Sequence, residues 1–153
     1  MAVLDLSNLP SPGPLLGIDP GSKTLGIAAC DRLRLIASPV ETITKGKKLT
    51  PALTRLLEIV DERNAVGLVI GLPLNMDGTE GPRTQSARAL ARNVIAARDM
   101  PVAFQDERLT SAQAERAMIE ADLSRARRAE LLAASSAAII LQTAIARLAN
   151  ATC

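Results

Sequence analysis

The chain of 153 residues contains no histidine, tryptophan or tyrosine, and its single aromatic residue is Phe104. The absence of histidine excludes Ser-His and Cys-His nucleophilic centres and His-ligated zinc sites. With one aromatic side chain, the protein cannot read single-stranded nucleic acid by stacking successive bases on aromatic rings. Any acid–base or metal chemistry must therefore rest on Asp, Glu and Lys.

Cysteines and long apolar runs are also scarce. Cys30 lies in a predicted strand and Cys153 is the last residue, a usage that fits a reducing compartment better than a structural disulfide. No apolar run reaches the roughly 18–20 residues of a membrane helix, and residues 1–14 lack the features of a signal peptide. We therefore expect a cytoplasmic protein without a membrane partner, built as one domain over 15–149 after a flexible arm over 1–14.

Hydrophobic residues make up 48% of the chain, enough for a core, and their spacing predicts the secondary structure. The predicted strands comprise residues 15–19, 24–31, 34–41, 66–73 and 101–106. The predicted helices begin at Thr50 with Thr as N-cap, comprise 86–98, begin at Thr110, and comprise 125–149. The first three strands follow one another too closely for helices and should form an antiparallel meander. The order predicts an α/β fold with a mixed five-stranded sheet, the meander plus parallel strands, flanked by helices on both faces.

Carboxylates follow two of the predicted strands, at the edge where ligands bind in open α/β sheets. Asp19 ends the first strand, and Asp106 and Glu107 follow the last. If these strands are neighbours, the carboxylate oxygens of Asp19 and Glu107 converge to about 4–7 Å, within reach of a shared ion. Carboxylates without histidine favour Mg²⁺ or Mn²⁺. Such ions activate a water and stabilise the leaving oxygen of a phosphodiester.

Basic residues are clustered although the net charge is only +2. The clusters are Lys45, Lys47 and Lys48, and Arg125, Arg127 and Arg128. We expect both clusters to bind nucleic-acid phosphates; the alternative is that they are solvated loops. Lys23, four residues after Asp19, and Arg108, next to Glu107, are expected to assist catalysis by offsetting charge on the phosphate.

Four motifs resemble those of a known family. GIDPGSKTLG at 17–26 resembles the opening G-x-D-x-G-x-K-x-x-G of the YqgF family, the Holliday-junction-resolvase-like or pre-16S rRNA nucleases. GLPLNMDG at 71–78 matches its G-L-P-x-x-x-D-G loop, and DERLT at 106–110 matches its D-E-R-x-T signature. AAIILQ at 137–142 is similar to its closing A-A-x-x-L-Q helix. The resemblance runs from about residue 15 to 148.

This resemblance implies a ribonuclease H-like fold and a metal-dependent nuclease that trims the 5′ end of pre-16S rRNA during ribosome biogenesis. It implies Asp19 and Glu107 as the catalytic, metal-binding acids. In one respect the chain departs from the family, which usually has an aspartate nine residues before the closing Gln, where this chain has Ala133. Glu130, one helical turn earlier, is a candidate third ligand or else a surface residue.

Other functions compete with this interpretation. Ala133 favours a nucleic-acid-binding factor in ribosome maturation with little or no catalysis. A Holliday-junction resolvase acting on branched DNA is a further alternative, and the lack of aromatics favours reading a backbone or duplex in either case. A sugar-kinase-like phosphotransferase shares the first turn, but its two-domain architecture does not fit 153 residues. The sequence leaves open whether the protein is a monomer or a homodimer.

Overall fold

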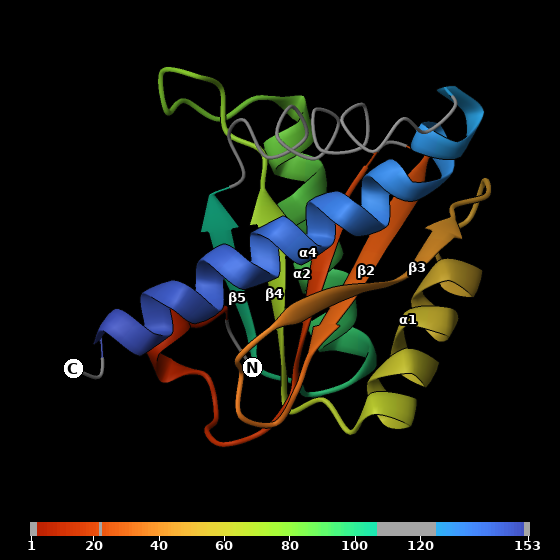
Figure 1. Ribbon diagram of the computed structural model, residues 1–153. Helices are drawn as coiled ribbons and strands as arrows, with labels where there is room; N and C mark the ends of the chain where they lie inside the picture. Colours follow the sequence, from red (N-terminus) through yellow and green to blue (C-terminus); the bar gives the residue numbers. More distant parts are fainter. Residues whose placement is uncertain (1–2, 22, 107–124, 152–153) are drawn as a thin grey trace.

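The computed structural model describes residues 3–21, 23–106 and 125–151, with the side chains of the last helix described over 132–149. Within these ranges the chain forms a five-stranded sheet with helices on both faces (Figure 1). The strands are β1 Leu15–Pro20, β2 Thr24–Cys30, β3 Ala37–Thr44, β4 Gly67–Leu72 and β5 Val102–Asp106. The helices are the short 3₁₀ helix η1 Leu6–Asn8, α1 Thr50–Arg63, α2 Pro82–Ala97 and α4 Arg125–Ala151.

The sheet has the order β3-β2-β1-β4-β5, with β1 at its centre. β1, β2 and β3 pair antiparallel, and β1, β4 and β5 run parallel, which confirms the predicted meander and parallel strands. The convergence predicted for Asp19 and Glu107 assumed that the first and last strands are neighbours, and this assumption is wrong because β4 lies between them. The parallel strands β1 and β5 still end at the same edge, two strand spacings or about 10 Å apart. We call this edge the carboxyl edge.

Each face of the sheet has its own core. α4 crosses one face, and its residues Ala137, Ile140 and Leu141 pack in one cluster with Leu15 of β1 and Val69 of β4 (Figure 1). α1 and α2 cover the other face, where residues of both helices pack on the opposite side chains of the same strands. The inward residues of α2 are those expected: Ala87, Leu90, Ala91 and Val94 are all buried. The predicted covering of both faces is confirmed.

Several element boundaries differ from the sequence prediction, and three of the differences concern where an element begins and what precedes it. β3 begins at Ala37 rather than residue 34, since the preceding segment forms a loop in which Arg34 has a φ of 58°. α2 begins at Pro82 rather than at residue 86, and the Gly81 N–H donates to the Thr84 hydroxyl in its first turn. Thr50 is the first residue of α1 rather than its N-cap, which is Leu49.

The segment before β1 is packed against the domain. The Leu4 N–H donates to the carbonyl of Val102 at 2.7 Å, and Leu6 and Leu9 are buried in the core beneath α4. Residues 4–9 therefore contact the sheet, whereas the sequence predicted a flexible arm; the flexibility of that arm stays a prediction.

Among the residues that the structure describes, one helical window, Leu132–Ala149, is long and apolar enough to cross a membrane by length and composition. This window belongs to α4, which packs along β1, β2 and β3. Its inward side chains are part of the core of the domain, so packing on the sheet accounts for its apolar character.

Candidate active site

Asp19 is a buried carboxylate at the carboxyl end of the central strand. The residue is 7% exposed. Side chains alternate between the two faces of the sheet along β1. Leu16 and Ile18 belong to the core on the α1 and α2 face, so Asp19 lies on the α4 face with Gly17. A tight turn follows, in which the Gly21 N–H donates to the carbonyl oxygens of Asp19 and Thr24 at 3.1 and 2.9 Å.

Two glycines bring α4 close to this carboxylate. A Cβ atom on Gly17 would lie 2.7 Å from the Cβ of Leu141 and 2.8 Å from the carbonyl oxygen of Ala137. Gly26, which is paired with Asp19 in the ladder between β1 and β2, would clash in the same way with the main chain of Ala133. The helix backbone therefore lies directly on the sheet beside Asp19, and position 133 borders the site.

The acid that ends β5 lies on the other face. Val102 is part of the core on the α1 and α2 face, so alternation along β5 puts Phe104 and Asp106 on that face too. Gln105 lies on the α4 face, where its side-chain oxygen accepts a 2.7 Å hydrogen bond from Arg147. Asp106 is thus not the partner of Asp19. The predicted second acid, Glu107, and its neighbour Arg108 lie outside the described residues.

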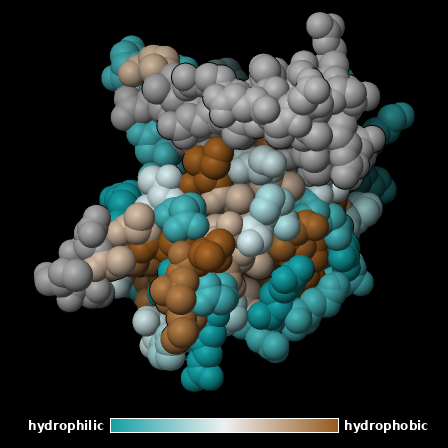
Figure 2. All heavy atoms as spheres, in the orientation of Figure 1, coloured by the Kyte–Doolittle hydropathy of each residue, from teal (hydrophilic) through white to brown (hydrophobic). Residues whose placement is uncertain are grey.

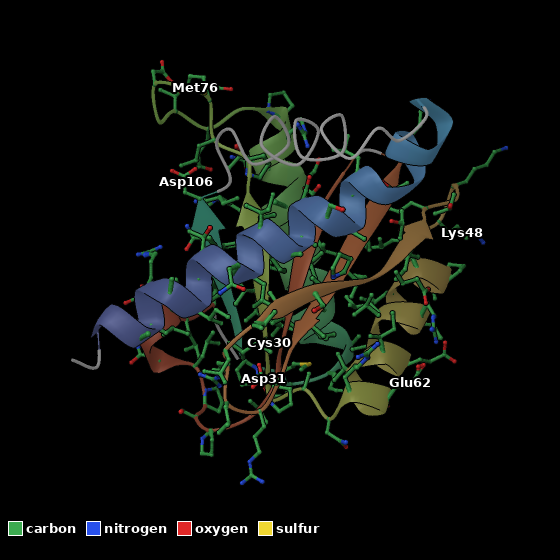
Figure 3. The ribbon with its side chains drawn as sticks, in the orientation of Figure 1. Cys30, Asp31, Lys48, Glu62, Met76 and Asp106 are labelled. Carbon is green, nitrogen blue, oxygen red and sulfur yellow. The ribbon has the colours of Figure 1, made fainter. Side chains whose placement is uncertain are left out.

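The predicted lysines lie at the carboxyl edge. Lys23 is exposed in the turn between β1 and β2, and its carbonyl oxygen accepts the N–H of Lys45 at 2.8 Å. Lys47 and Lys48 are exposed in the loop that begins with Lys45 after β3, which we call the lysine loop. The last residue of β3 pairs with the first residue of β2, so the lysine loop starts beside the turn that holds Lys23. Figure 3 shows Lys48 at the same edge as Asp106, and Asp31 at the opposite edge.

The predicted arginine cluster and Glu130 lie in the first turns of α4, where their backbone is described and their side chains are not. Figure 1 shows this end of α4 beside the place where β2 begins and β3 ends. The lysine loop starts from this end of β3. The members of this group are Arg125, Arg127, Arg128 and Glu130.

The loop between β4 and α2 is ordered by its own side chains, which sequence reasoning gave no role. The Asp77 carboxylate accepts the N–H and hydroxyl of Thr79 at 2.9 and 2.6 Å, and the Asn75 amide donates to that hydroxyl at 2.9 Å. Gly78 has a φ of 89°, a conformation that favours glycine. The Asp-Gly pair in the motif was the available indication of this turn. It holds Met76, 65% exposed, at the carboxyl edge (Figure 3).

The glutamine of the closing motif is structural. The Gln142 side-chain oxygen accepts the N–H of Ala37 at 2.9 Å, and its amide donates to the carbonyl of Leu35. The same loop is held by Asp31, whose carboxylate accepts the backbone N–H groups of Ile36 and Leu35; these bonds hold its pKa below the ordinary range. Gln142 thus fixes the loop before β3, at the edge opposite Asp19.

Nearby, Cys30 is a free, buried thiol rather than half of a disulfide. Burial raises its pKa, although the N–H of Leu15 donates to its sulfur at 3.3 Å. A thiol with a raised pKa is a poor nucleophile, so Cys30 packs in the core without catalytic chemistry.

The described residues contain no group of three His, Cys, Asp or Glu side chains placed to hold a metal ion. Within them, Asp19 supplies a hard oxygen ligand of the kind that Mg²⁺ and Mn²⁺ take. This donor chemistry fits such an ion.

Hydrophobic side chains gather over the loop between β2 and β3 (Figure 2). They are Leu33, Leu35 and Ile36, each at least 65% exposed. This patch lies at the edge opposite Asp106 and is not part of the candidate active site (Figure 3).

The chain is similar to known proteins over nearly its whole length. Residues 13–147 match the model of RuvX, described as Holliday junction resolvase. A protein of Rhodobacter capsulatus named "Putative pre-16S rRNA nuclease" is 53% identical over 93% of this chain and 89% of its own length. One of the same name from Cereibacter sphaeroides is 51% identical over 94% of this chain and 89% of its own length.

Solved structures share the fold. RuvC from T. thermophilus, in complex with Holliday junction substrate, superposes with a TM-score of 0.55 over 89% of this chain and 96% of that chain, at 17% identity. This likeness confirms the predicted ribonuclease H-like fold. The match to the family model confirms the resemblance in the sequence motifs, since RuvX is another name for YqgF. The chain belongs to the RuvX family.

Proposed function

We propose that this protein is a nuclease that hydrolyses phosphodiester bonds in the 5′ region of pre-16S rRNA, in the cytoplasm. The observation that carries the proposal is the buried carboxylate of Asp19 at the carboxyl end of the central strand, with lysines of two loops at the same edge. Relatives that are half identical and named for pre-16S rRNA supply the substrate class.

Asp19 and Glu107 would hold a divalent ion, Mg²⁺ or Mn²⁺, with Glu130 as a third candidate ligand. When bound, such an ion activates a water and stabilises the charge on the leaving oxygen. The low exposure of Asp19 supports its role, because a carboxylate shielded from water interacts more strongly with a cation.

The remaining residues would act on the substrate. Lys23, exposed in the turn that follows Asp19, would offset negative charge on the phosphate, together with Arg108. The phosphates of the strand would bind the lysine loop and the arginines at the start of α4. The lysine loop supports this role by its place at the carboxyl edge. The substrate-binding set is Lys45, Lys47, Lys48, Arg125, Arg127 and Arg128.

A second candidate function is binding of a ribosomal precursor with little or no cleavage. Ala133 favours it, because its main chain lies against Gly26, the ladder partner of Asp19, and its side chain offers no ligand there. Branched DNA is the alternative substrate suggested by the description of the family model.

One assay separates these functions. Purified protein and its Asp19→Asn variant are incubated with pre-16S RNA and with a four-way DNA junction, with Mn²⁺ or with EDTA. We expect the parent protein to cleave the RNA with Mn²⁺ but not with EDTA, and the variant to cleave it under neither condition. Binding without cleavage would favour the second function, and cleavage of the junction alone would identify a resolvase.

A further inference from the structure

A cavity of about 220 Å³ opens on the α1 and α2 face of the carboxyl edge. It lies between the turn after β1, the lysine loop after β3 and one side of α2. Its lining includes Pro20, Leu25, Lys45, Leu49, Leu90 and Asn93 and contains no Asp or Glu. The cavity is therefore suited to a neutral or anionic ligand.

The cavity and the candidate active site share one segment of chain, the end of β1. Pro20 in its wall directly follows Asp19, and because neighbouring side chains along β1 point to opposite faces, the two sit on either side of the sheet edge. The hydrogen bond from the Lys45 N–H to the Lys23 carbonyl ties the lysine loop to the turn after Asp19. A nucleic-acid strand that crosses the sheet edge at Asp19 therefore passes beside the mouth of the cavity.

The lining has the chemistry that holds a base and its phosphate. Leu25, Leu49 and Leu90 provide apolar walls for the faces of a planar ring. The Asn93 amide offers both a donor and an acceptor to the edge of a base. Lys45 supplies a cation for a phosphate. The rest of the lysine loop, beside the cavity, adds Lys47 and Lys48.

We propose that this cavity binds one nucleotide of the substrate strand, with its base between the apolar walls and its phosphate at Lys45. The inference rests on the proposed function and adds a contact to a base. The cavity, at about 220 Å³, has room for a single ring system. A chain with one aromatic residue holds a base in this way by enclosing it between aliphatic side chains.

The test uses two ligands of equal charge, without divalent metal. These are a fluorescently labelled five-nucleotide RNA of uridines and the same sugar–phosphate chain without bases. We expect the parent protein to bind the RNA at least about fivefold more tightly, because burying the apolar surface of one base against aliphatic side chains contributes on this scale. Equal affinities for the two ligands, or no binding of either at low salt, would overturn the proposal.

Variants locate the effect. Ala89→Met fills the cavity and should bind both ligands with the affinity of the abasic chain, whereas Ala96→Met, an exposed position on the same helix, should behave like the parent. Asn93→Ala, at an exposed position, should lower the preference for bases without disturbing the core. Full preference in both cavity variants, with native circular dichroism, would place the base elsewhere and refute the assignment.

Two further measurements distinguish a free nucleotide from a nucleotide of the substrate strand, and the proposed function from this inference. Uridine monophosphate is titrated alone; if it binds as tightly as the RNA and the RNA does not displace it, the cavity holds a free nucleotide and the strand proposal is wrong. Cleavage of pre-16S RNA is assayed in parallel. Base preference without cleavage contradicts only the proposed function, whereas cleavage without base preference contradicts only this inference.

Discussion

The main-chain carbonyl of Ala133 occupies the space that a Cβ atom on Gly26 would fill. Gly26 pairs with Asp19 across the ladder between β1 and β2, so this contact sets how closely α4 approaches the buried carboxylate. A second glycine, Gly17, meets the helix in the same way at Ala137 and Leu141. The geometry of the candidate site thus depends on two positions without side chains, neither of which can contribute chemistry.

Gly26→Ala should destabilise the protein. The clash is with the helix backbone rather than with a flexible side chain, so α4 must shift, and overpacking of this kind costs about 1–3 kcal/mol or more of unfolding free energy. Urea unfolding measures the effect. Gly46→Ala is the matched control, because a Cβ there has no atom within 4 Å, and its unfolding free energy should change little. Equal stability of the two variants would contradict the close packing of α4.

Neutralising the lysine loop should lower the affinity for RNA and make that affinity depend less steeply on the salt concentration. Removing one lysine–phosphate ion pair lowers the log–log slope of affinity against salt by about 0.7–0.9. Replacing Lys45, Lys47 and Lys48 with Gln should therefore reduce the slope by about 2, measured by anisotropy in a salt series.

The control removes the same kind of charge at the opposite edge. The three arginines are Arg32 in the loop between β2 and β3, Arg63 at the end of α1 and Arg98 after α2. Their replacement with Gln should leave the slope unchanged. A slope that falls equally in both sets would mean that binding reads net charge alone, and that the lysine loop is not a binding site.

Lys23→Ala should slow cleavage while metal affinity is kept. Removing a buried donor to transition-state charge costs about 10²–10³ in kcat. Lys23 is exposed, so we expect a smaller effect of about tenfold, with Lys23→Arg partly active. Single-turnover rates and Mn²⁺ titration provide the measurements. A variant that cleaves at the parent rate would show that Lys23 is an ordinary loop lysine.

Asp31→Asn should make the protein less stable at neutral pH but not in acid. The pKa of Asp31 is lowered by the N–H groups of Ile36 and Leu35, so its carboxylate stabilises the fold above the unfolded value of about 3.9. That contribution is lost as the pH falls through the lowered folded pKa. Urea unfolding at pH 7 and in acid measures the difference, which should shrink with falling pH. A constant difference would mean that the ionised carboxylate is not what holds the loop.

Local patterns in the sequence predicted the pieces that carry the candidate site. The continuous apolar run of β4 indicated a strand buried on both faces, and the acid after the first run placed Asp19 at a strand end. The inward face of α2 followed from helical spacing. These features depend on residues close together in sequence, so a single chain contains the information.

The order of strands was not predictable in the same way. Nothing in the periodicity of β1, β4 or β5 states which of them is central, because all three are apolar runs, and β4 was not expected between the other two. The start of β3 was missed for a related reason. Its first residues are replaced by a loop that depends on Asp31 and on Gln142, which lies more than a hundred residues away. Contacts of this range leave no periodic pattern.

The resemblance to the family implies an aspartate at the position of Ala133, and introducing one should strengthen the site. Ala133→Asp should raise Mn²⁺ affinity and cleavage, because position 133 lies beside the ladder partner of Asp19 and the change adds a hard oxygen ligand there. With Asp19 and Glu107 as the carboxylate ligands, the parent should hold an ion weakly and be a slow nuclease, more active with Mn²⁺ than with Mg²⁺. Mn²⁺ binding by calorimetry and cleavage of pre-16S RNA are measured for both proteins. Ala146→Asp, at an exposed position of the same helix, adds the same charge away from the site and should change neither. If the Ala133→Asp variant folds normally and gains no more than this control, position 133 does not face the metal, and the role of the third family acid does not carry over to this helix.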